Sequence, residues 1–380
     1  SVENPSNIQQ VFQIIQNQLQ DSELVVVFSA FGGVTEQLFG MANLAKSGKQ
    51  DYKKGLLALE GRHLGMANAL LGNEKREKVD VFIRQRFHEL EDLYHGIYLI
   101  KEQSSRTLDY VASFGERLST YILAEALAAQ GIPTCFVDAR EIIRTDDRFG
   151  QARVEEATTH AQIQDYFAKH EGIKVVTGFI ASTAKGETTT LGRSGSDYTA
   201  AILASALNAE VLEIWTDVSG VLTCDPKMVY AAFTIPQLSY AEAMELSHFG
   251  AKVIFPATMQ PAMKKNIPIQ IKNTFEPTHS GTLINGEVRE GGWIKGISSR
   301  SNLSLVTLQS AGWMAAGGSL GRIFTVLSEA RLSSLLISQA SLQHSICFAL
   351  ATEEAILAKE LIEKEFYYEI KSGEMDPVSL

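Results

Sequence analysis

Short apolar strand patterns alternate with helical patterns along most of this chain, and that alternation most restricts its fold. The strand patterns are brief, rich in β-branched residues and bounded by glycine or polar residues, at 24–33, 134–138, 173–182, 211–218 and 267–273. Helical patterns separate them, at 8–19, 74–103, 110–130, 199–207 and 240–251. Because parallel strands need a crossover between them, this order predicts an α/β fold with a mainly parallel sheet and helices on both faces.

The pattern changes in the last quarter of the chain. Residues 279–293 are polar and glycine-rich, and we expect a connector with little core of its own. Beyond it the sequence predicts a strand, a helix, two strands and a helix, at 302–310, 317–330, 335–341, 344–351 and 353–366. This order is most of a ferredoxin-like unit, whose final strand we expect near residues 367–371 or just beyond.

Charge and cysteine usage exclude several classes of protein. Lys plus Arg number 34 and Asp plus Glu 44, a net charge of −10, so the chain is a poor general binder of nucleic acid, which needs a clustered cationic surface. No apolar run reaches the ~20 residues of a membrane helix. Cys135, Cys224 and Cys347 are far apart in sequence, so neither a metal site nor a disulfide framework is expected, and a reducing compartment fits best.

Polar, glycine-containing loops follow several of the expected strands, where open α/β sheets bind ligands. The most specific is TTTLGRSGSDYTA, residues 188–200. Gly192 and Gly195 allow close backbone approach, and Arg193 can bind a carboxylate through two parallel hydrogen bonds. Ser196 and Asp197 precede the expected helix, whose free N–H groups suit an anion. For Asp197 alone, an ordinary helix cap explains the residue equally well.

Three further loops carry weaker signals. FSAFGGVT, residues 28–35, suits a phosphate or a small substrate, although a simple turn explains it too. SFGERLST, residues 113–120, places Glu116 and Arg117 in what we expect to be a first helical turn. WTDVSGVLTCDP, residues 215–226, surrounds a glycine turn with acidic and hydroxyl residues and suits an adenosine and its phosphates. The chain has no GxxxxGK[ST] motif and no GxGxxG motif opening a helix.

Taken together, these strings resemble aspartokinases over essentially the whole chain, as do MELSHFGAKVIFPAT and GRIFTVLSEARLSSLLISQAS. The resemblance is strongest to the kinase half of the bifunctional aspartokinase–homoserine dehydrogenases. It implies a three-layer amino-acid-kinase fold, carbamate-kinase-like, followed by an ACT regulatory domain. It also implies phosphorylation of the side-chain carboxylate of L-aspartate by ATP and Mg²⁺, with the ion held mainly by phosphates and no separate protein metal site.

The resemblance also implies residue roles. Arg193 would bind the substrate α-carboxylate and Glu116 its ammonium, with Thr35 and Ser196 as further aspartate contacts. Asp197 would organise the phosphates as a catalytic residue together with Arg193. The implied nucleotide-binding residues are Thr216, Asp217, Leu222, Lys227 and Lys252. A carboxylate nucleophile is already ionised at pH 7, so the chemistry needs no general base.

Three departures from the family pattern carry expectations. The family opens with Lys-Phe-Gly-Gly-Thr-Ser-Val, whereas this chain opens at Ser1-Val2, so we expect a missing first strand and crippled catalysis. Ser194 replaces a usual glycine, and Leu222 stands where a Tyr is common; both changes are expected to alter nucleotide affinity. The alternative function is therefore an amino-acid-binding regulatory fragment without kinase activity. A kinase acting on glutamate or carbamate is less consistent with the ACT segment.

The resemblance finally predicts domain limits and partners. We expect a kinase domain at 1–285, a linker at 286–296 and an ACT domain at 297–380, the last being one unit of a family that carries two. Threonine or lysine is the expected effector, binding near Gln339, because a polar side chain beside the buried run 335–337 needs a partner. The expected assembly is a homo-oligomer formed through ACT domains in the cytoplasm, without nucleic acid or membrane.

Overall fold

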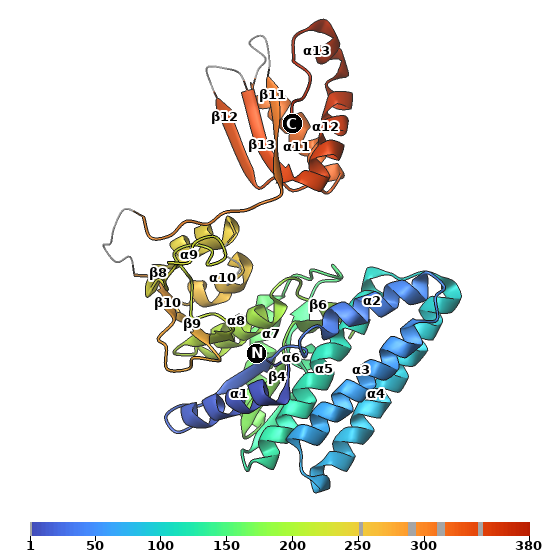
Figure 1. Ribbon diagram of the computed structural model, residues 1–380, viewed down its shortest axis with the longest axis vertical. Coiled ribbons are helices and arrows are strands. Elements are labelled where there is room, and N and C mark those ends of the chain that lie inside the picture. The colour runs from blue at the N-terminus through green and yellow to red at the C-terminus, as the bar shows by residue number, and fades with distance from the viewer. Residues whose placement is uncertain (1, 251–253, 288–293, 310–315, 341–344) are drawn as a thin grey trace. The chain divides into compact units, whose positions relative to one another are not determined.

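The chain divides into two compact units. The computed structural model describes residues 2–250, 254–287, 294–309, 316–340 and 345–380 (Figure 1). Unit 1 is Ser1–Ser298 and unit 2 is Ser299–Leu380. Among the described residues, no helix combines the length and apolar character needed to cross a bilayer.

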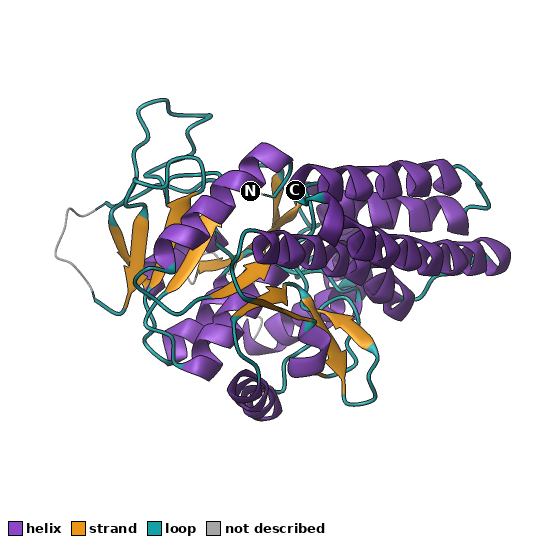
Figure 2. Cartoon of the chain, turned by 90° about the horizontal axis from the view of Figure 1, so that it is seen from below, coloured by secondary structure: helices purple, strands orange, loops and turns teal. Residues whose placement is uncertain are grey.

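The first part of unit 1 is a small parallel sheet covered by long helices. Its elements are α1 (Pro5–Gln18), β1 (Val25–Phe28), α2 (Val34–Lys46), α3 (Tyr52–Leu70), α4 (Asn73–Ile100), α5 (Ser105–Ala129), β2 (Thr134–Val137) and β4 (Ile173–Thr177). The sheet has the order β1-β4-β2 and is parallel throughout. Helices α2 to α5 pack against one another (among the purple helices of Figure 2), and α5 also contacts all three strands.

Helix α5 is the central helix of this part and is unusually polar for its burial. Most of its buried apolar residues from Val111 to Leu127 lie in the largest core cluster. A helix buried on all sides is normally hydrophobic all round. Helix α5 nevertheless buries Asp109, Glu116 and Arg117. Burying an ionisable group is unfavourable for folding unless a partner compensates it, so these three residues are candidates for a functional role.

The second part of unit 1 carries two further sheets. Its other elements are α6 (Ala139–Ile142), β3 (Arg144–Thr145), α7 (Glu156–Lys169), β5 (Ile180–Thr183), β6 (Thr188–Thr190), α8 (Gly195–Leu207), β7 (Leu212–Thr216), β8 (Gln237–Ser239), α9 (Tyr240–His248), α10 (Pro256–Lys264), β9 (Ile269–Asn273) and β10 (Thr282–Asn285). The sheets have the orders β3-β5-β6 and β7-β9-β10-β8, with antiparallel pairing only at β5–β6 and β9–β10. Helix α8 contacts both β1 and β7.

The mainly parallel α/β architecture is confirmed, but several local predictions in unit 1 are wrong. Residues 173–182 form two strands, because Phe179 adopts a left-handed backbone with φ 68° after Gly178. Residues 279–293 are not wholly a connector, because β10 lies inside its sheet with Thr282 and Ile284 buried. Helix α8 begins at Gly195, so Ser196 and Asp197 lie in its first turn rather than before it.

Unit 2 confirms the predicted β-α-β-β-α order. It contains β11 (Leu303–Gln309), α11 (Ala316–Glu329), β12 (Leu336–Ala340), β13 (Ser345–Ala351), α12 (Thr352–Glu365) and α13 (Tyr367–Ser372). The sheet is antiparallel with the order β11-β13-β12. One face packs on α11 and α12 through buried residues such as Val306, Phe348 and Ile362.

Two expectations for unit 2 need correction. Residues 367–371 are helical, and the segment that pairs with the free edge of β11 lies further on, where Ser379 bridges Thr307. The run 335–337 is not buried: β12 is an edge strand, and Leu336 and Ile337 are 48% and 46% exposed. Gln339 is exposed as well, so burial gives it no need for a partner.

Candidate active site

Two parallel strands and the start of a helix meet at one edge of the first sheet. Strands β1 and β4 end side by side, and the Gly178 N–H donates to the Phe28 carbonyl at 2.8 Å. A β-carbon at Gly178 would lie 2.5 Å from Ser196 Oγ, so only glycine allows α8 to begin this close to the strand end. The free N–H groups of the first turn of α8 therefore lie beside the carboxyl ends of β1 and β4.

Helix α5 brings Glu116 to the same edge. A β-carbon at Gly115 would lie 2.9 Å from the Ala30 β-carbon, so the helix crosses the loop after β1 at close range. The Ala30 N–H hydrogen-bonds to the Glu116 carboxyl group. Glu116 lies in the middle of α5, not in its first turn, and is only 3% exposed, so it is not a surface residue favoured by the helix dipole.

The Glu116 carboxyl group is incompletely satisfied. Its Oε2 atom is buried and has no hydrogen-bond partner. Burial raises the pKa of this carboxyl to about 8, and the backbone N–H bonds lower it only in part. A buried acid with a free oxygen fits a cationic ligand group, which would restore the ionised form and fill the vacant acceptor.

Arg193 and Asp197, on the glycine-rich loop and the helix turn after it, differ in their exposure to solvent. Arg193 is exposed and forms no ion pair with the described residues. Ser194 occupies the N-cap position of α8 in a left-handed conformation, φ 54°, which turns the chain sharply into the helix. Asp197 is half-buried in the first turn, where burial raises its pKa to about 6. Ser196 is half-buried in the same turn.

The remaining predicted residues of unit 1 lie on other elements. Thr35 is half-buried in the first turn of α2, directly after the loop that holds Ala30. Thr216 ends β7, and its Oγ lies 3.1 Å from an oxygen of Asp217. Leu222 bridges Thr234, whereas Lys227 is exposed.

The turn before Lys227 has an internal explanation. Asp225 Oδ1 accepts the Lys227 N–H at 2.9 Å, so this acidic side chain caps a local turn. Lys252 lies outside the described residues. The described part of the chain contains no group of three or more His, Cys, Asp or Glu side chains placed to hold a metal ion.

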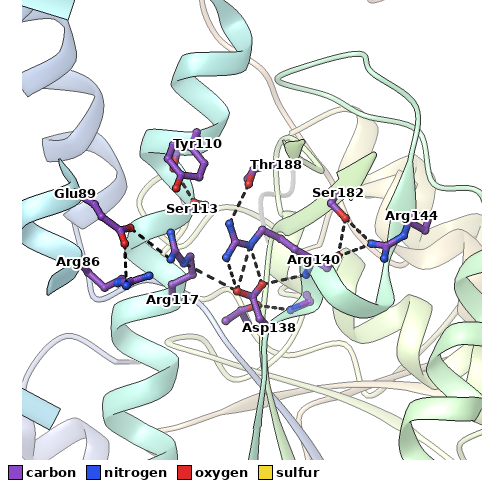
Figure 3. A network of polar contacts seen from close by, with 12 residues as sticks. Arg86, Glu89, Tyr110, Ser113, Arg117, Asp138, Arg140, Arg144, Ser182 and Thr188 are labelled. Carbon is purple, nitrogen blue, oxygen red and sulfur yellow. Dashed lines mark hydrogen bonds and ion pairs between the residues drawn. The ribbon is translucent and has the colours of Figure 1, made fainter. Parts of the chain in front are cut away.

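A polar network beside Glu116 holds three elements together (Figure 3). Arg117 lies between Glu89 of α4 and Asp138 after β2, at ion-pair distances of 3.8 Å and 4.0 Å. Asp138 also pairs with Arg140 at 2.6 Å, and the Arg117 guanidinium stacks over the Phe114 ring. Burial and the neighbouring arginines lower the pKa of Arg117. The network fixes α5 against α4 and against the carboxyl end of β2.

Family models match both units. The amino acid kinase family matches residues 1–273, and an ACT domain matches residues 306–366. The chain is 33% identical to the lysine-sensitive aspartokinase 3 of Escherichia coli, over 89% of this chain and 75% of that protein. This chain is an aspartokinase family member. Its resemblance to that family, and the fold that the resemblance implied, are thereby confirmed.

Solved aspartokinase structures share the fold. The E. coli aspartokinase III structure in complex with aspartate and ADP superposes with a TM-score of 0.83 at 31% identity, covering 100% of this chain and 83% of that one. The Clostridium acetobutylicum aspartate kinase gives a TM-score of 0.80 at 25% identity, with coverage of 100% and 82%. The aspartokinase likeness therefore extends over both units.

Longer aspartokinase relatives carry additional sequence. The chain is 32% identical to bifunctional aspartokinase/homoserine dehydrogenase 2 of Zea mays, over 99% of this chain but 42% of that protein. The Haemophilus influenzae bifunctional enzyme shows 32% identity over 100% of this chain and 47% of its own length. The chain thus spans less than half the length of these bifunctional aspartokinases.

Sequence reasoning missed one polar residue beside this candidate site. Asp109 accepts hydrogen bonds from Gly150 and Thr190, at the base of the loop that carries Arg193. A signal was available, because Asp109 lies seven residues before Glu116, a spacing that places both on one face of a helix. Residues 146–152 also form a polar loop after β3, with a glycine at position 150.

Proposed function

We propose that this chain phosphorylates the side-chain carboxylate of L-aspartate with ATP. The observation that carries the proposal is that a buried acid, Glu116, and an exposed arginine, Arg193, lie on segments that meet at one sheet edge. An α-amino acid presents an ammonium and a carboxylate on neighbouring atoms, so it matches one acidic and one basic receptor. The structural relative in complex with aspartate and ADP supports this choice of substrates.

In the proposed reaction, an oxygen of the aspartate side chain attacks the γ-phosphorus of ATP. A phosphorus–oxygen bond to the side chain forms, the bond to the ADP oxygen breaks, and the products are 4-phospho-L-aspartate and ADP. The attacking carboxylate is already ionised, so no residue needs to remove a proton. The work of the protein is to align two anions and to stabilise the transferred charge.

Each proposed role follows from a position in the site. Arg193 binds the α-carboxylate, Glu116 binds the ammonium, and Thr35 and Ser196 offer hydroxyl groups at the two helix starts beside them. The first turn of α8 offers N–H groups to the transferred phosphoryl group. Asp197, a half-buried acid in that turn, organises the phosphate end of the site.

ATP is proposed to bind through the loop after β7. The residues assigned to it are Thr216, Asp217, Leu222, Lys227 and Lys252. The loop 188–200 and this loop are joined by α8, which contacts both β1 and β7. When bound, Mg²⁺ would neutralise part of the negative charge of the ATP phosphates. Asp197 fits a position beside such a cation, because burial raises its pKa and a nearby positive charge would restore its ionised form.

A coupled assay of ADP release tests this function. The protein with ATP and Mg²⁺ should release ADP upon addition of L-aspartate, and L-glutamate should be a much poorer substrate. ADP release with glutamate but not aspartate would contradict the substrate assignment. No release with either would favour the regulatory alternative, which the whole-chain similarity to aspartokinases does not favour.

Unit 2 is proposed to bind an amino acid effector and to join subunits. The support is its match to an ACT domain and the exposed apolar residues Leu336 and Ile337 on the edge strand β12. Edge strands with exposed apolar residues favour pairing with another chain. Threonine or lysine is the proposed effector, with Gln339 on the same strand as a contact. Titration of each amino acid against wild-type and Gln339→Ala kinase activity tests this, since unchanged inhibition would remove Gln339 from the effector site.

We also propose a cytoplasmic location. The chemistry consumes ATP, and the side chains of Cys135, Cys224 and Cys347 are all free thiols, as expected in a reducing compartment.

A further inference from the structure

Asp109 is a buried carboxylate that joins α5 to two segments far along the chain. It is 3% exposed. Its Oδ2 atom accepts the Gly150 N–H at 2.8 Å and the Thr190 N–H at 3.0 Å, and its Oδ1 atom accepts the Thr190 hydroxyl at 2.8 Å. Burial raises the pKa of this carboxyl, while the three donors lower it. Three hydrogen bonds to its two carboxyl oxygens therefore offset the unfavourable burial of this acid.

Both segments held by Asp109 lie at the base of the loop that carries Arg193. Thr190 ends β6, three residues before Arg193, and its carbonyl accepts the Ala152 N–H at 2.9 Å. A β-carbon at Gly192 would lie 3.2 Å from Gln151 Cγ, so the segment after Gly150 packs directly against the residue that precedes Arg193. One carboxylate thus fixes β6 and the loop 146–152 together, next to the residues that directly precede Arg193.

Asp109 also shares a helix face with Glu116. The two residues are seven positions apart, which is about two turns, and both are buried. Helix α5 is therefore a rigid element whose one end holds the base of the Arg193 loop and whose middle carries the Glu116 carboxyl group. The spacing between the two charged receptors depends on that attachment.

We propose that Asp109 is a positioning residue that sets the location of Arg193 relative to Glu116, and so tunes recognition of the α-carboxylate of an α-amino acid. This inference rests on the proposed function and deepens it. Asp109 does not touch the substrate in this scheme. It acts through the backbone of Thr190 and Gly150, so its loss should weaken the contact made by Arg193 and spare the contact made by Glu116.

Two variants separate positioning from simple loss of stability. Asp109→Ala removes all three acceptors. Asp109→Asn keeps an oxygen for the two backbone N–H groups, and its amide group can donate to the Thr190 hydroxyl, which can accept as well as donate. The alanine variant should raise the KM for L-aspartate at least about tenfold with the KM for ATP within about twofold, and the asparagine variant should restore most of the affinity.

Substrate fragments locate the lost contact. β-Alanine lacks the α-carboxylate of aspartate, whereas succinate lacks the ammonium; both are measured as competitive inhibitors against L-aspartate. In Asp109→Ala the inhibition constant of succinate should rise with the aspartate KM, because both ligands use Arg193, and that of β-alanine should stay within about twofold of wild type. A proportional weakening of all three ligands would show that Asp109 is only structural and would overturn the proposal.

Amide hydrogen exchange tests the same idea without any turnover. Asp109→Ala should speed exchange in residues 148–152 and 188–193 while the middle of α5 keeps its protection, and unchanged exchange in these two segments would overturn the proposal. A wild-type protein that fails to phosphorylate aspartate would overturn the proposed function, whereas the exchange measurement would still decide whether Asp109 holds the two segments.

Discussion

Gly178 packs against Ser196 with no room for a side chain: a β-carbon on Gly178 would lie 2.9 Å from the Ser196 Cα atom. A side chain can rotate away from such a clash, but a backbone atom at the start of a helix cannot. The contact therefore links the end of β4 to the first turn of α8, where the proposed phosphoryl site lies.

Gly178→Ala should consequently destabilise the protein and weaken catalysis together. Overpacking at a close backbone contact typically costs about 1–3 kcal/mol of unfolding free energy, and displacement of α8 should lower kcat. Denaturant unfolding and steady-state kinetics measure the two effects. Gly61→Ala is the matched control, because a β-carbon there meets no atom within 4 Å and helix α3 should gain about 0.5–1 kcal/mol. If Gly178→Ala behaves like this control, the contact has no functional importance.

Arg193→Ala should raise the KM for L-aspartate strongly and leave the KM for ATP nearly unchanged. Losing a bidentate contact to a carboxylate costs on the order of 2–4 kcal/mol, which corresponds to about 30- to 1000-fold in affinity. Arg193→Lys should recover only part of this loss, because an ammonium cannot bind both oxygens in a plane. The control is Arg84→Ala, an exposed arginine on α4 that should alter neither constant. An unchanged aspartate KM in Arg193→Ala would remove this residue from the substrate site.

Glu116 should make aspartate binding dependent on pH. Its pKa of about 8 means that the carboxyl is protonated at neutral pH in the free protein, whereas the substrate ammonium requires the ionised form. Aspartate binding should therefore release a proton, and the KM for aspartate should fall as pH rises from 6 toward 8, by at most tenfold per pH unit.

The comparison with Glu116→Gln isolates this effect. The amide keeps the shape of the side chain but cannot ionise, so its aspartate KM should be high and flat across the same pH range. Isothermal titration with a non-hydrolysable ATP analogue should show nearly unchanged nucleotide affinity. Loss of nucleotide binding would instead place Glu116 in the other half of the site.

Much of the fold follows from periodicity, because a buried strand and an amphipathic helix each leave a local pattern. The break within residues 173–182 does not, since it depends on the left-handed conformation of Phe179 and on a contact with Ser196 from a later helix. Residues 282–285 lie within a polar, glycine-rich segment that gives no strand pattern, and their pairing with β8 and β9 makes them a strand.

The candidate site divides in the same way. Gly192, Arg193 and Asp197 form one contiguous loop, so their chemistry is visible in the sequence. Asp109 is different. Its helical spacing from Glu116 is visible in the sequence, but its donors lie 41 and 81 residues away, so its contacts cannot be predicted from the residues around it. Its burial could not be predicted from a helix pattern that began at residue 110, when the helix in fact begins at Ser105.

His63 should make the protein less stable in mild acid. The imidazole is fully buried between the rings of Phe31 and Phe87, each with its centroid 5.4 Å away, and one ring nitrogen pairs with the Leu59 carbonyl at 2.8 Å. The other nitrogen, Nε2, has no partner, and burial lowers the pKa of the ring to about 4. The folded protein therefore holds His63 neutral at a pH where the unfolded chain, with a pKa near 6.5, binds a proton.

The sign of the effect follows from that difference. Above about pH 6.5 the ring is neutral in both states and contributes no pH dependence; as pH falls from 6.5 toward 4, only the unfolded chain gains a proton, so stability is lost. Between pH 7 and pH 5 the loss should be about 2 kcal/mol.

His63→Leu keeps an apolar side chain in the same space and cannot titrate. Between pH 7 and pH 5, the unfolding free energy of wild type should therefore fall by about 2 kcal/mol relative to that of the variant. Urea denaturation of both proteins at pH 7 and pH 5 gives the comparison, and since Glu116 titrates equally in both, any difference between them belongs to His63. Equal losses in the two proteins would mean that the folded state accommodates the protonated ring.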